Sequence, residues 1–401
     1  MNSLPTVLLK PGEADRIIAG HPWIYEGAVL RSAAEIKDGD IVQIKDHRQR
    51  FLGVGFWNSR SRIRVRVLAP DRIEINQPFF EQRIREALAL RQKAMPEATS
   101  FRVVNAESDF LSGLIIDKYE DVLAIQISSL GMDRRKLEII AALQTIFSPR
   151  AIIERSDVGS RKFEGLEESR GVIAGELPPG EFIVKLNGLP FATDLATGHK
   201  TGLYLDQQVN YARVAAYCAG ANVLDCFTFL GGFAIHAAKA GAAHVHGVDQ
   251  SADAVAAAQR NALANGVAEK CTFDTANVFD WFKAQTATGP HEKVIPRYDV
   301  IVLDPPSFTR TRAAVGDAMR GYKEIHLRSL KLLKRGGTLA TFCCSHHVDA
   351  NLFQDAILSA AYDAHKILRR VATYSQSPDH PIIPSIPETE YLKGFAFELV
   401  R

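Results

Sequence analysis

The chain has 401 residues, a length that predicts two or three domains. Hydrophobic residues make up 46% and charged residues 23%, which is ordinary for a globular protein and disfavours disorder, a collagen-like chain and a coiled-coil rod. The formal net charge of +2 is too mild to identify a nucleic-acid partner. Because the sequence shows neither a leader pattern nor a long uncharged apolar run, we expect a soluble, cytoplasmic protein.

Residues 1–75 predict a small β-barrel, because short runs such as TVLLK, GDIVQIKD, FLGVGFW and RIRVRVL alternate apolar and polar positions. Residues 45–72 hold eight basic against two acidic residues, a local excess of six and a candidate phosphate-binding face. In the last run Arg62, Arg64 and Arg66 should lie on the face opposite the apolar residues. These three arginines are candidate RNA contacts, and a solvated arginine ladder is the alternative.

Residues 76–195 predict an α+β domain that links two others. The helix-like stretch PFFEQRIREALALRQKAM is followed by the strands of LIIDKYEDVLAIQIS, a second helix and further strands, with no visible catalytic motif. From residue 196 onward strands alternate with helices, which predicts βαβ units and a parallel, doubly wound sheet. Ligands of such sheets bind at the carboxyl ends of the strands.

Two acidic residues end strands of this predicted sheet. The strand ANVLD ends at Asp225, and the loop CFTFLGG leads into a helix whose start would lie near a bound ligand, with Gly231 and Gly232 allowing close approach. The strand HVHGVD ends at Asp249, which is placed to accept hydrogen bonds from a ribose. The loop lacks the G-x-G-x-x-G spacing of dinucleotide sites, and Asp225 suits a cationic methionine group. We therefore expect S-adenosylmethionine, with an ordinary strand–turn–helix as the alternative.

A second cluster of chemically capable residues follows two later strands. The strand YDVIVLD runs into Asp304, where two prolines fix the backbone, so that Asp304 could accept from an exocyclic amine while Phe308 stacks on a planar base. A purely structural turn is the alternative. The strand TLATF ends in Cys343 and Cys344, and strand alternation lets only one thiol enter a cleft beside Asp304. A core role for both thiols is the competing interpretation.

Neither a disulfide framework nor a metal site is expected. The five cysteines are an odd set without C-x-x-C spacing. His346 and His347 follow Cys344 closely, but such contiguous residues lack the spacing of zinc ligands and a fourth ligand is not evident.

The motifs LDCFTFLGGFAIHAAKAG, VLDPPSF and CCS, with KTGLYLDQQ before them and PETEYLKGFAFEL after them, resemble one family. This is the bacterial ribosomal RNA large subunit methyltransferase I family, S-adenosylmethionine-dependent enzymes that form 5-methylcytosine in 23S ribosomal RNA. The opening LLKPGEADRIIAGHPWIYEGAV resembles its PUA-type RNA-binding domain. The resemblance implies a barrel over residues 1–75, a linking domain over 76–195 and a Rossmann-like class I methyltransferase domain over 196–401.

By position, the resemblance also implies roles for individual residues. Cys344, directly before Ser345, would be the nucleophile. Two positions depart from the family pattern: Asn277 replaces an acid beside the adenine and could accept a hydrogen bond through its amide oxygen, and Gln208 replaces the arginine of the family's LDQR. The implied cofactor contacts are Asp225, Phe227, Gly231, Asp249, Asn277 and Asp304.

The implied chemistry needs a thiol, because carbon 5 of cytosine becomes nucleophilic only after a nucleophile has added at carbon 6. Asp304 would stabilise the charge that develops on the ring, and the base that removes the carbon 5 proton is not identified. Methylation of an RNA nitrogen, for example on guanine, would use the same cofactor loop without Cys344. A non-catalytic RNA-binding factor and a nicotinamide-dependent dehydrogenase are further alternatives. The sequence leaves the oligomeric state open, and a homodimer is compatible with it.

Overall fold

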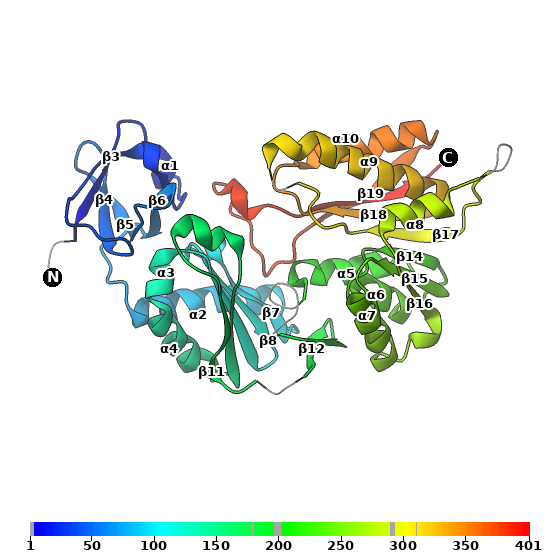
Figure 1. Cartoon of the computed structure of the whole chain (residues 1–401), viewed down its shortest axis with the longest axis horizontal. Coiled ribbons are helices and arrows are strands. Elements are labelled where there is room, and N and C mark those ends of the chain that lie inside the picture. The colour runs from blue at the N-terminus through cyan, green and yellow to red at the C-terminus, as the bar shows by residue number, and fades with distance from the viewer. Residues whose placement is uncertain (1–3, 178–179, 196–202, 289–292, 310) are drawn as a thin grey trace. The chain divides into compact units, whose positions relative to one another are not determined.

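The computed structural model describes residues 4–177, 180–195, 203–288, 293–309 and 311–401 (Figure 1). The chain divides into two compact units. The amino-terminal unit comprises Met1–Lys185, Thr193–Leu205 and Pro378–Thr389. The carboxyl-terminal unit comprises Leu186–Ala192, Asp206–Ser377 and Glu390–Arg401.

The amino-terminal unit begins with a six-stranded sheet in the order β2-β6-β5-β4-β1-β3. Only β1 and β4 pair in parallel. Apolar residues at alternate positions, such as Val42 and Ile44 in β4, fill the core of this sheet, as the sequence pattern predicts. The elements are β1 (Thr6–Leu9), α1 (Asp15–Ile18), β2 (Trp23–Tyr25), β3 (Val29–Ser32), β4 (Ile41–Lys45), β5 (Phe51–Trp57) and β6 (Ile63–Ala69).

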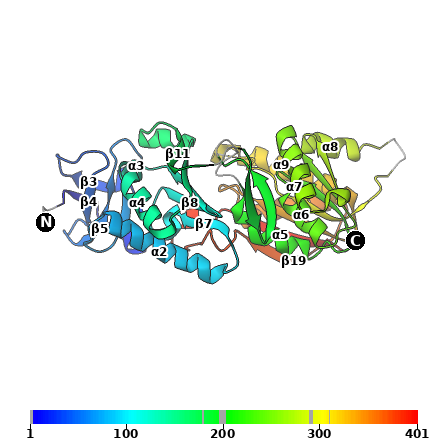
Figure 2. The same cartoon turned by 90° about the horizontal axis from the view of Figure 1, so that it is seen from below.

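A five-stranded sheet in the order β11-β10-β9-β8-β7 follows in the same unit. Helices α2 and α4 lie side by side against it (Figure 2). Asn76 caps α2 by accepting a hydrogen bond from the Phe79 backbone N–H. Phe56 of β5 belongs to the same hydrophobic core as this sheet, and a Cβ at Gly131 would lie 2.1 Å from the Phe56 ring. The elements are α2 (Gln77–Ala94), β7 (Ser100–Asn105), β8 (Leu114–Tyr119), β9 (Val122–Ile127), α3 (Leu130–Arg134), α4 (Lys136–Phe147), β10 (Ala151–Ser156) and β11 (Ser169–Gly175).

The predicted strand run FIVKLNGLPF forms a separate two-stranded sheet of β12 (Phe182–Leu186) and β13 (Leu189–Thr193). Asn187 lies at its turn with a positive φ of 51°. Leu186–Ala192, which includes the turn and most of β13, belongs to the carboxyl-terminal unit, and the flanking residues belong to the amino-terminal unit.

The carboxyl-terminal unit is built on a seven-stranded sheet in the order β16-β15-β14-β17-β18-β20-β19. Strands β14 to β18 are parallel, which confirms the predicted doubly wound sheet, whereas β20 runs antiparallel to both neighbours. Helices α9 and α10 lie on one face of the sheet and α6 and α7 on the other (Figure 1). The strand order reverses between β14 and β17, the point at which doubly wound sheets bind their ligands.

The elements of this unit are α5 (Gln208–Ala215), β14 (Asn222–Cys226), α6 (Gly232–Lys239), β15 (His244–Asp249), α7 (Ala252–Ala264), β16 (Cys271–Thr275), α8 (Val278–Gln285), β17 (Tyr298–Leu303), α9 (Val315–Leu332), β18 (Leu333–Cys343), α10 (Ala350–Asp363), β19 (Leu368–Ser375) and β20 (Lys393–Leu399).

Candidate active site

The loop between β14 and α6 has an unusual backbone. Phe227, Phe229 and Gly231 all have positive φ, at 63°, 49° and 85°. Only glycine adopts this region freely, so the two phenylalanines are held in a conformation that costs roughly 1–3 kcal/mol each. The Phe227 and Thr228 backbone N–H groups both donate to the Val248 carbonyl oxygen, at 2.8 and 3.1 Å. The end of β15 therefore fixes this loop.

Asp225 lies beneath the loop and is fully buried. Its Oδ2 accepts hydrogen bonds from Thr228 Oγ1 at 2.6 Å and from the Ala234 backbone N–H at 3.0 Å. Its Oδ1 is buried and has no hydrogen-bond partner among the described residues. Burial raises the pKa of Asp225 to about 7. An unsatisfied buried oxygen is costly, so this atom suits a donor group of a bound cofactor.

Asp249 ends β15 and holds the same loop from the other side. Its Oδ2 accepts from the Phe229 backbone N–H at 3.0 Å, and its Oδ1 accepts from the Ser251 backbone N–H at 2.9 Å. Each carboxylate oxygen has further lone pairs that could take a ribose hydroxyl. Asp249 therefore orders the loop, and its contact with a ribose stays a prediction.

Glycine is required at positions 231 and 232 of the loop for two different structural reasons. Gly231 takes the left-handed position before α6, which favours glycine. A Cβ at Gly232 would lie 2.6 Å from Cζ of Tyr211 in α5. Packing against Tyr211 therefore explains the glycine at position 232, and close approach of a ligand to the two glycines stays a prediction.

Asn277 caps helix α8. Its Oδ1 accepts from the backbone N–H groups of Phe279 and Asp280 at 3.0 and 3.4 Å. The amide oxygen expected to serve the adenine is thus occupied as a helix cap. What Asn277 can offer an adenine more readily is its Nδ2 donor group.

Two motif positions upstream of this loop were noted in the sequence. Gln208, at the position of the family arginine, begins α5 and is buried. Residues 200–202, which open the motif KTGLYLDQQ, lie outside the described residues.

The turn after β17 joins the cofactor loop through aromatic contacts. Asp304 is half-buried at the end of the strand. Phe308 packs against Tyr322 of α9, Phe279 of α8 and Phe227 of the loop, with ring centroids 4.6, 5.7 and 6.5 Å apart. These contacts fix the orientation of the Phe308 ring, and its stacking on a substrate base remains a prediction.

The paired thiols point in different directions, as strand alternation requires. Cys343 is fully buried in the core, and its Sγ donates to Tyr322 Oη at 3.3 Å. Cys344 is half-buried, and its Sγ lies 4.0 Å from the Pro305 carbonyl oxygen. The second thiol is therefore the one beside the turn that holds Asp304.

Sequence reasoning missed the residues that support this thiol. Lys393, the first residue of β20, donates from Nζ to the Ser345 and Val348 carbonyl oxygens at 2.7 and 2.6 Å. Burial lowers the pKa of Lys393. The Ser345 hydroxyl lies 2.9 Å from Ser307 Oγ and 3.1 Å from Tyr322 Oη. The only available signal was the segment PETEYLKGFAFEL, which contains Lys393 but suggests no chemistry.

Arg62, which directly precedes β6, and Arg64 and Arg66 within it do not form a free basic face. Arg62 is exposed, Arg64 forms an ion pair with Glu26, and Arg66 is only 9% exposed. Arg66 donates to Glu164 Oε1 at 2.9 Å. The prediction that Arg66 contacts RNA is wrong for this reason, since its charge is buried and already paired.

Among the described residues, no three His, Cys, Asp or Glu side chains gather in a way that could hold a metal ion. Within the same described part of the chain, no helix has the length and apolar character needed to cross a bilayer.

The sheet order, the strained loop after β14 and the acid that ends β15 define the class of S-adenosylmethionine-dependent methyltransferases. Residues 143–390 match the family model of these methyltransferases, and residues 7–70 match the PUA-like domain. The fold is also that of a solved protein from Streptococcus mutans described as a SAM-dependent methyltransferase. That structure has a TM-score of 0.81 and 20% identity, over 98% of this chain and 99% of that chain.

The family follows from closer relatives. Ribosomal RNA large subunit methyltransferase I of Shewanella amazonensis is 41% identical over 392 residues, which covers 97% of this chain and 98% of the relative. The protein of the same name from Klebsiella pneumoniae is 37% identical over 396 residues, or 98% of both chains. The chain belongs to the ribosomal RNA large subunit methyltransferase I family. The predicted family, fold class and cofactor are thereby confirmed.

Proposed function

We propose that this chain methylates carbon 5 of a cytosine in 23S ribosomal RNA, in the cytoplasm, with Cys344 as the nucleophile. The ribosomal RNA substrate is taken from the names of its relatives. The observation that carries the cysteine chemistry is the placement of the Cys344 thiol beside the Asp304–Pro305 turn while Cys343 is buried in the core. A thiol at this point is unnecessary for methylation of a ring nitrogen.

The strained loop between β14 and α6 would bind S-adenosylmethionine. Asp225 Oδ1 would accept from the methionine amino group, Asp249 would accept from the ribose hydroxyls, and Asn277 would meet the adenine through Nδ2. Phe227 and Gly231 would line the loop against the cofactor. When bound, S-adenosylmethionine supplies an electrophilic methyl group.

In the reaction, the Cys344 thiolate adds to carbon 6 of the cytosine and forms a carbon–sulfur bond. The ring electrons move toward carbon 5, which becomes nucleophilic enough to accept the methyl group. Asp304 would hold the exocyclic amine or ring nitrogen, with Phe308 beside the ring. A base then takes the carbon 5 proton, the electrons of that carbon–hydrogen bond restore the ring double bond, and the carbon–sulfur bond breaks to release the thiolate.

Lys393 supports this thiol as a positioning residue. Its two hydrogen bonds to the Ser345 and Val348 carbonyl oxygens fix the segment that directly follows Cys344. Its ammonium also places positive charge in the surroundings of Cys344, the proposed nucleophile.

We propose three domains with separate roles. Residues 1–75 form an RNA-binding barrel, residues 76–195 form a linking domain, and residues 196–401 form the catalytic domain. Of the three candidate arginines, Arg62 is the exposed one, whereas Arg64 and Arg66 form ion pairs, so Arg62 is the simplest candidate among them for a phosphate contact.

The adjacent thiols provide a matched pair of variants. Cys344→Ala should abolish methylation while calorimetry still detects S-adenosylmethionine binding. Cys343→Ala should keep measurable turnover and lose some stability, because it removes a buried sulfur that contacts Tyr322. RNA with 5-fluorocytosine at the target should trap a covalent adduct with wild type and with Cys343→Ala, since fluorine cannot leave as a proton does. If Cys344→Ala methylates at a rate comparable with wild type, the thiol mechanism fails and methylation of a nitrogen becomes the better interpretation.

A further inference from the structure

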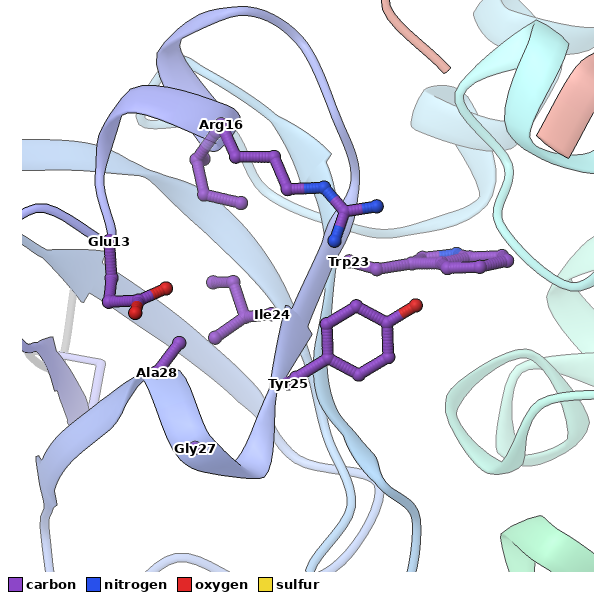
Figure 3. A pocket seen from close by; sticks show the side chains of 8 residues that line it. Glu13, Arg16, Trp23, Ile24, Tyr25, Gly27 and Ala28 are labelled. Atoms are coloured by element: carbon purple, nitrogen blue, oxygen red, sulfur yellow. The ribbon is translucent and has the colours of Figure 1, made fainter. Parts of the chain in front are cut away.

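A small cavity lies on the amino-terminal sheet, where α1 and β2 meet. Its volume is about 220 Å³, and its walls include Glu13, Arg16, Trp23, Ile24 and Tyr25. Figure 3 shows the Arg16 guanidinium and the Trp23 and Tyr25 rings reaching to the same side, with the Glu13 carboxylate on the other side of Ile24. Two aromatic rings and a cation thus share one surface opening.

The aromatic wall is held rigidly. The Trp23 and Tyr25 rings meet edge to face at 6.4 Å. The Trp23 indole N–H donates to Glu107 Oε1 at 3.0 Å and lies 3.2 Å from Ser112 Oγ. Tyr25 remains 38% exposed, although the Arg16 guanidinium lies over its ring and the Trp23 ring meets it edge to face. A fixed, exposed aromatic face is suited to stacking because a partner loses little side-chain freedom in meeting it.

The charges around the cavity are already balanced. Arg16 forms an ion pair with Glu388 at 3.3 Å and lies 5.3 Å from the centre of the Tyr25 ring. His21 also contacts Glu388, at 3.1 Å, and burial lowers the pKa of His21, so that it is neutral near pH 7. Glu13 adds a further negative group. A phosphate would therefore find no surplus of positive charge here, whereas a neutral planar ring would find the exposed Tyr25 ring beside a guanidinium.

We propose that this cavity binds one unstacked base of single-stranded RNA, which stacks on the exposed part of the Tyr25 ring beside the Arg16 guanidinium. Single-stranded RNA is recognised in this way, by aromatic and guanidinium planes beneath splayed bases. The proposal rests on the proposed function in one respect, the RNA nature of the substrate. It adds a base-binding pocket to the barrel that does not involve Arg64 or Arg66.

Base stacking and phosphate contact have different salt dependence, which allows a sharp test. Affinity for a single-stranded oligoribonucleotide is measured by fluorescence anisotropy, without cofactor, over a series of salt concentrations. Tyr25→Ala should weaken binding roughly tenfold and leave the slope of log affinity against log salt unchanged, because no phosphate contact is lost. Tyr25→Phe keeps the ring and should bind as wild type does. The matched control is Tyr362→Ala, which removes a tyrosine that is 80% exposed on α10 and should not change affinity.

Arg16→Met should also weaken binding, since it removes the guanidinium that borders the Tyr25 ring. Unchanged affinity for Tyr25→Ala would overturn the pocket. A salt slope that falls together with the affinity would overturn it as well, in favour of a phosphate site. The two proposals can fail separately. If Tyr25→Ala weakens RNA binding tenfold but wild type forms no 5-methylcytosine, the proposed cytosine chemistry is refuted and the proposed pocket is not.

Discussion

The buried Asp225 carboxyl predicts an unusual pH dependence of both stability and cofactor affinity. Its pKa is raised by burial to about 7, compared with an ordinary value of 3.8. Because the folded chain keeps this proton to a higher pH than the unfolded chain, it binds more protons between about pH 4 and pH 7. The contribution of Asp225 to stability therefore falls as the pH rises through this window, and above about pH 7 the ionised carboxylate destabilises the chain by about 4 kcal/mol.

Asp225→Asn removes this titration and keeps an oxygen for the Thr228 and Ala234 donors. It also places an amide N–H group at the position of Oδ1, which costs about 1–3 kcal/mol if no acceptor is found. That cost does not depend on pH. A change with pH in the stability difference between variant and wild type therefore reports the titration of the Asp225 carboxyl alone. The stability difference between Asp225→Asn and wild type should shift in favour of the variant by about 2–3 kcal/mol between about pH 5 and pH 8.

Urea unfolding at the two pH values measures this difference. Asp355→Asn is the control, because Asp355 is exposed in the middle of α10 and its replacement should give the same stability difference at both pH values. In parallel, calorimetry should find that wild type binds S-adenosylmethionine roughly tenfold more weakly at about pH 6 than at about pH 8, since a cationic group requires the ionised carboxylate. A stability difference for Asp225→Asn that is equal at both pH values would refute this reasoning, whatever the affinity.

Two further predictions concern other buried or loop-forming carboxylates. Asp249→Ala should weaken S-adenosylmethionine binding by roughly 10- to 100-fold, through loss of the ribose contact and of the bond to the Phe229 N–H, and unchanged affinity by calorimetry would exclude Asp249 from the cofactor site. Glu164→Gln should destabilise the amino-terminal unit by about 1–3 kcal/mol, because it removes the nearer of the two carboxylates that pair with the buried Arg66 and leaves only Glu107, at 3.5 Å. Urea unfolding checks the second prediction, and adding Arg66→Met to the variant should recover part of the lost stability.

The parts of the site that depend on strand ends could be predicted from the sequence. Asp225 and Asp249 end apolar runs of strand length, and the alternation of a strand separates Cys343 from Cys344 without any knowledge of the fold. These inferences need only local periodicity and the rule that parallel strands present their carboxyl ends together.

The parts of the structure that depend on contacts between residues distant in sequence could not be predicted. Arg66 looks like a member of a basic ladder until Glu164, 98 residues later, is brought against it. The packing reason for Gly232 depends on Tyr211, which fills the space that a Cβ would need and which no local sequence pattern identifies. The direction of β20 could not be predicted either, because its apolar pattern fits a parallel or an antiparallel strand. Its direction is set by its place between β18 and β19, with which it pairs antiparallel.

The strained cofactor loop and the thiol are positioned by one continuous set of contacts. Two phenylalanines with positive φ would be replaceable by glycine if backbone freedom were the only need. Phe227, however, contacts Phe308 at 6.5 Å, Phe308 contacts Tyr322 at 4.6 Å, and Tyr322 Oη lies 3.1 Å from the hydroxyl of Ser345, the residue after the half-buried Cys344. A glycine in place of Phe227 would relieve the backbone and break the first contact of this series. The strain is therefore retained because the same ring that is forced into a left-handed position ties the cofactor loop to the residues around the thiol.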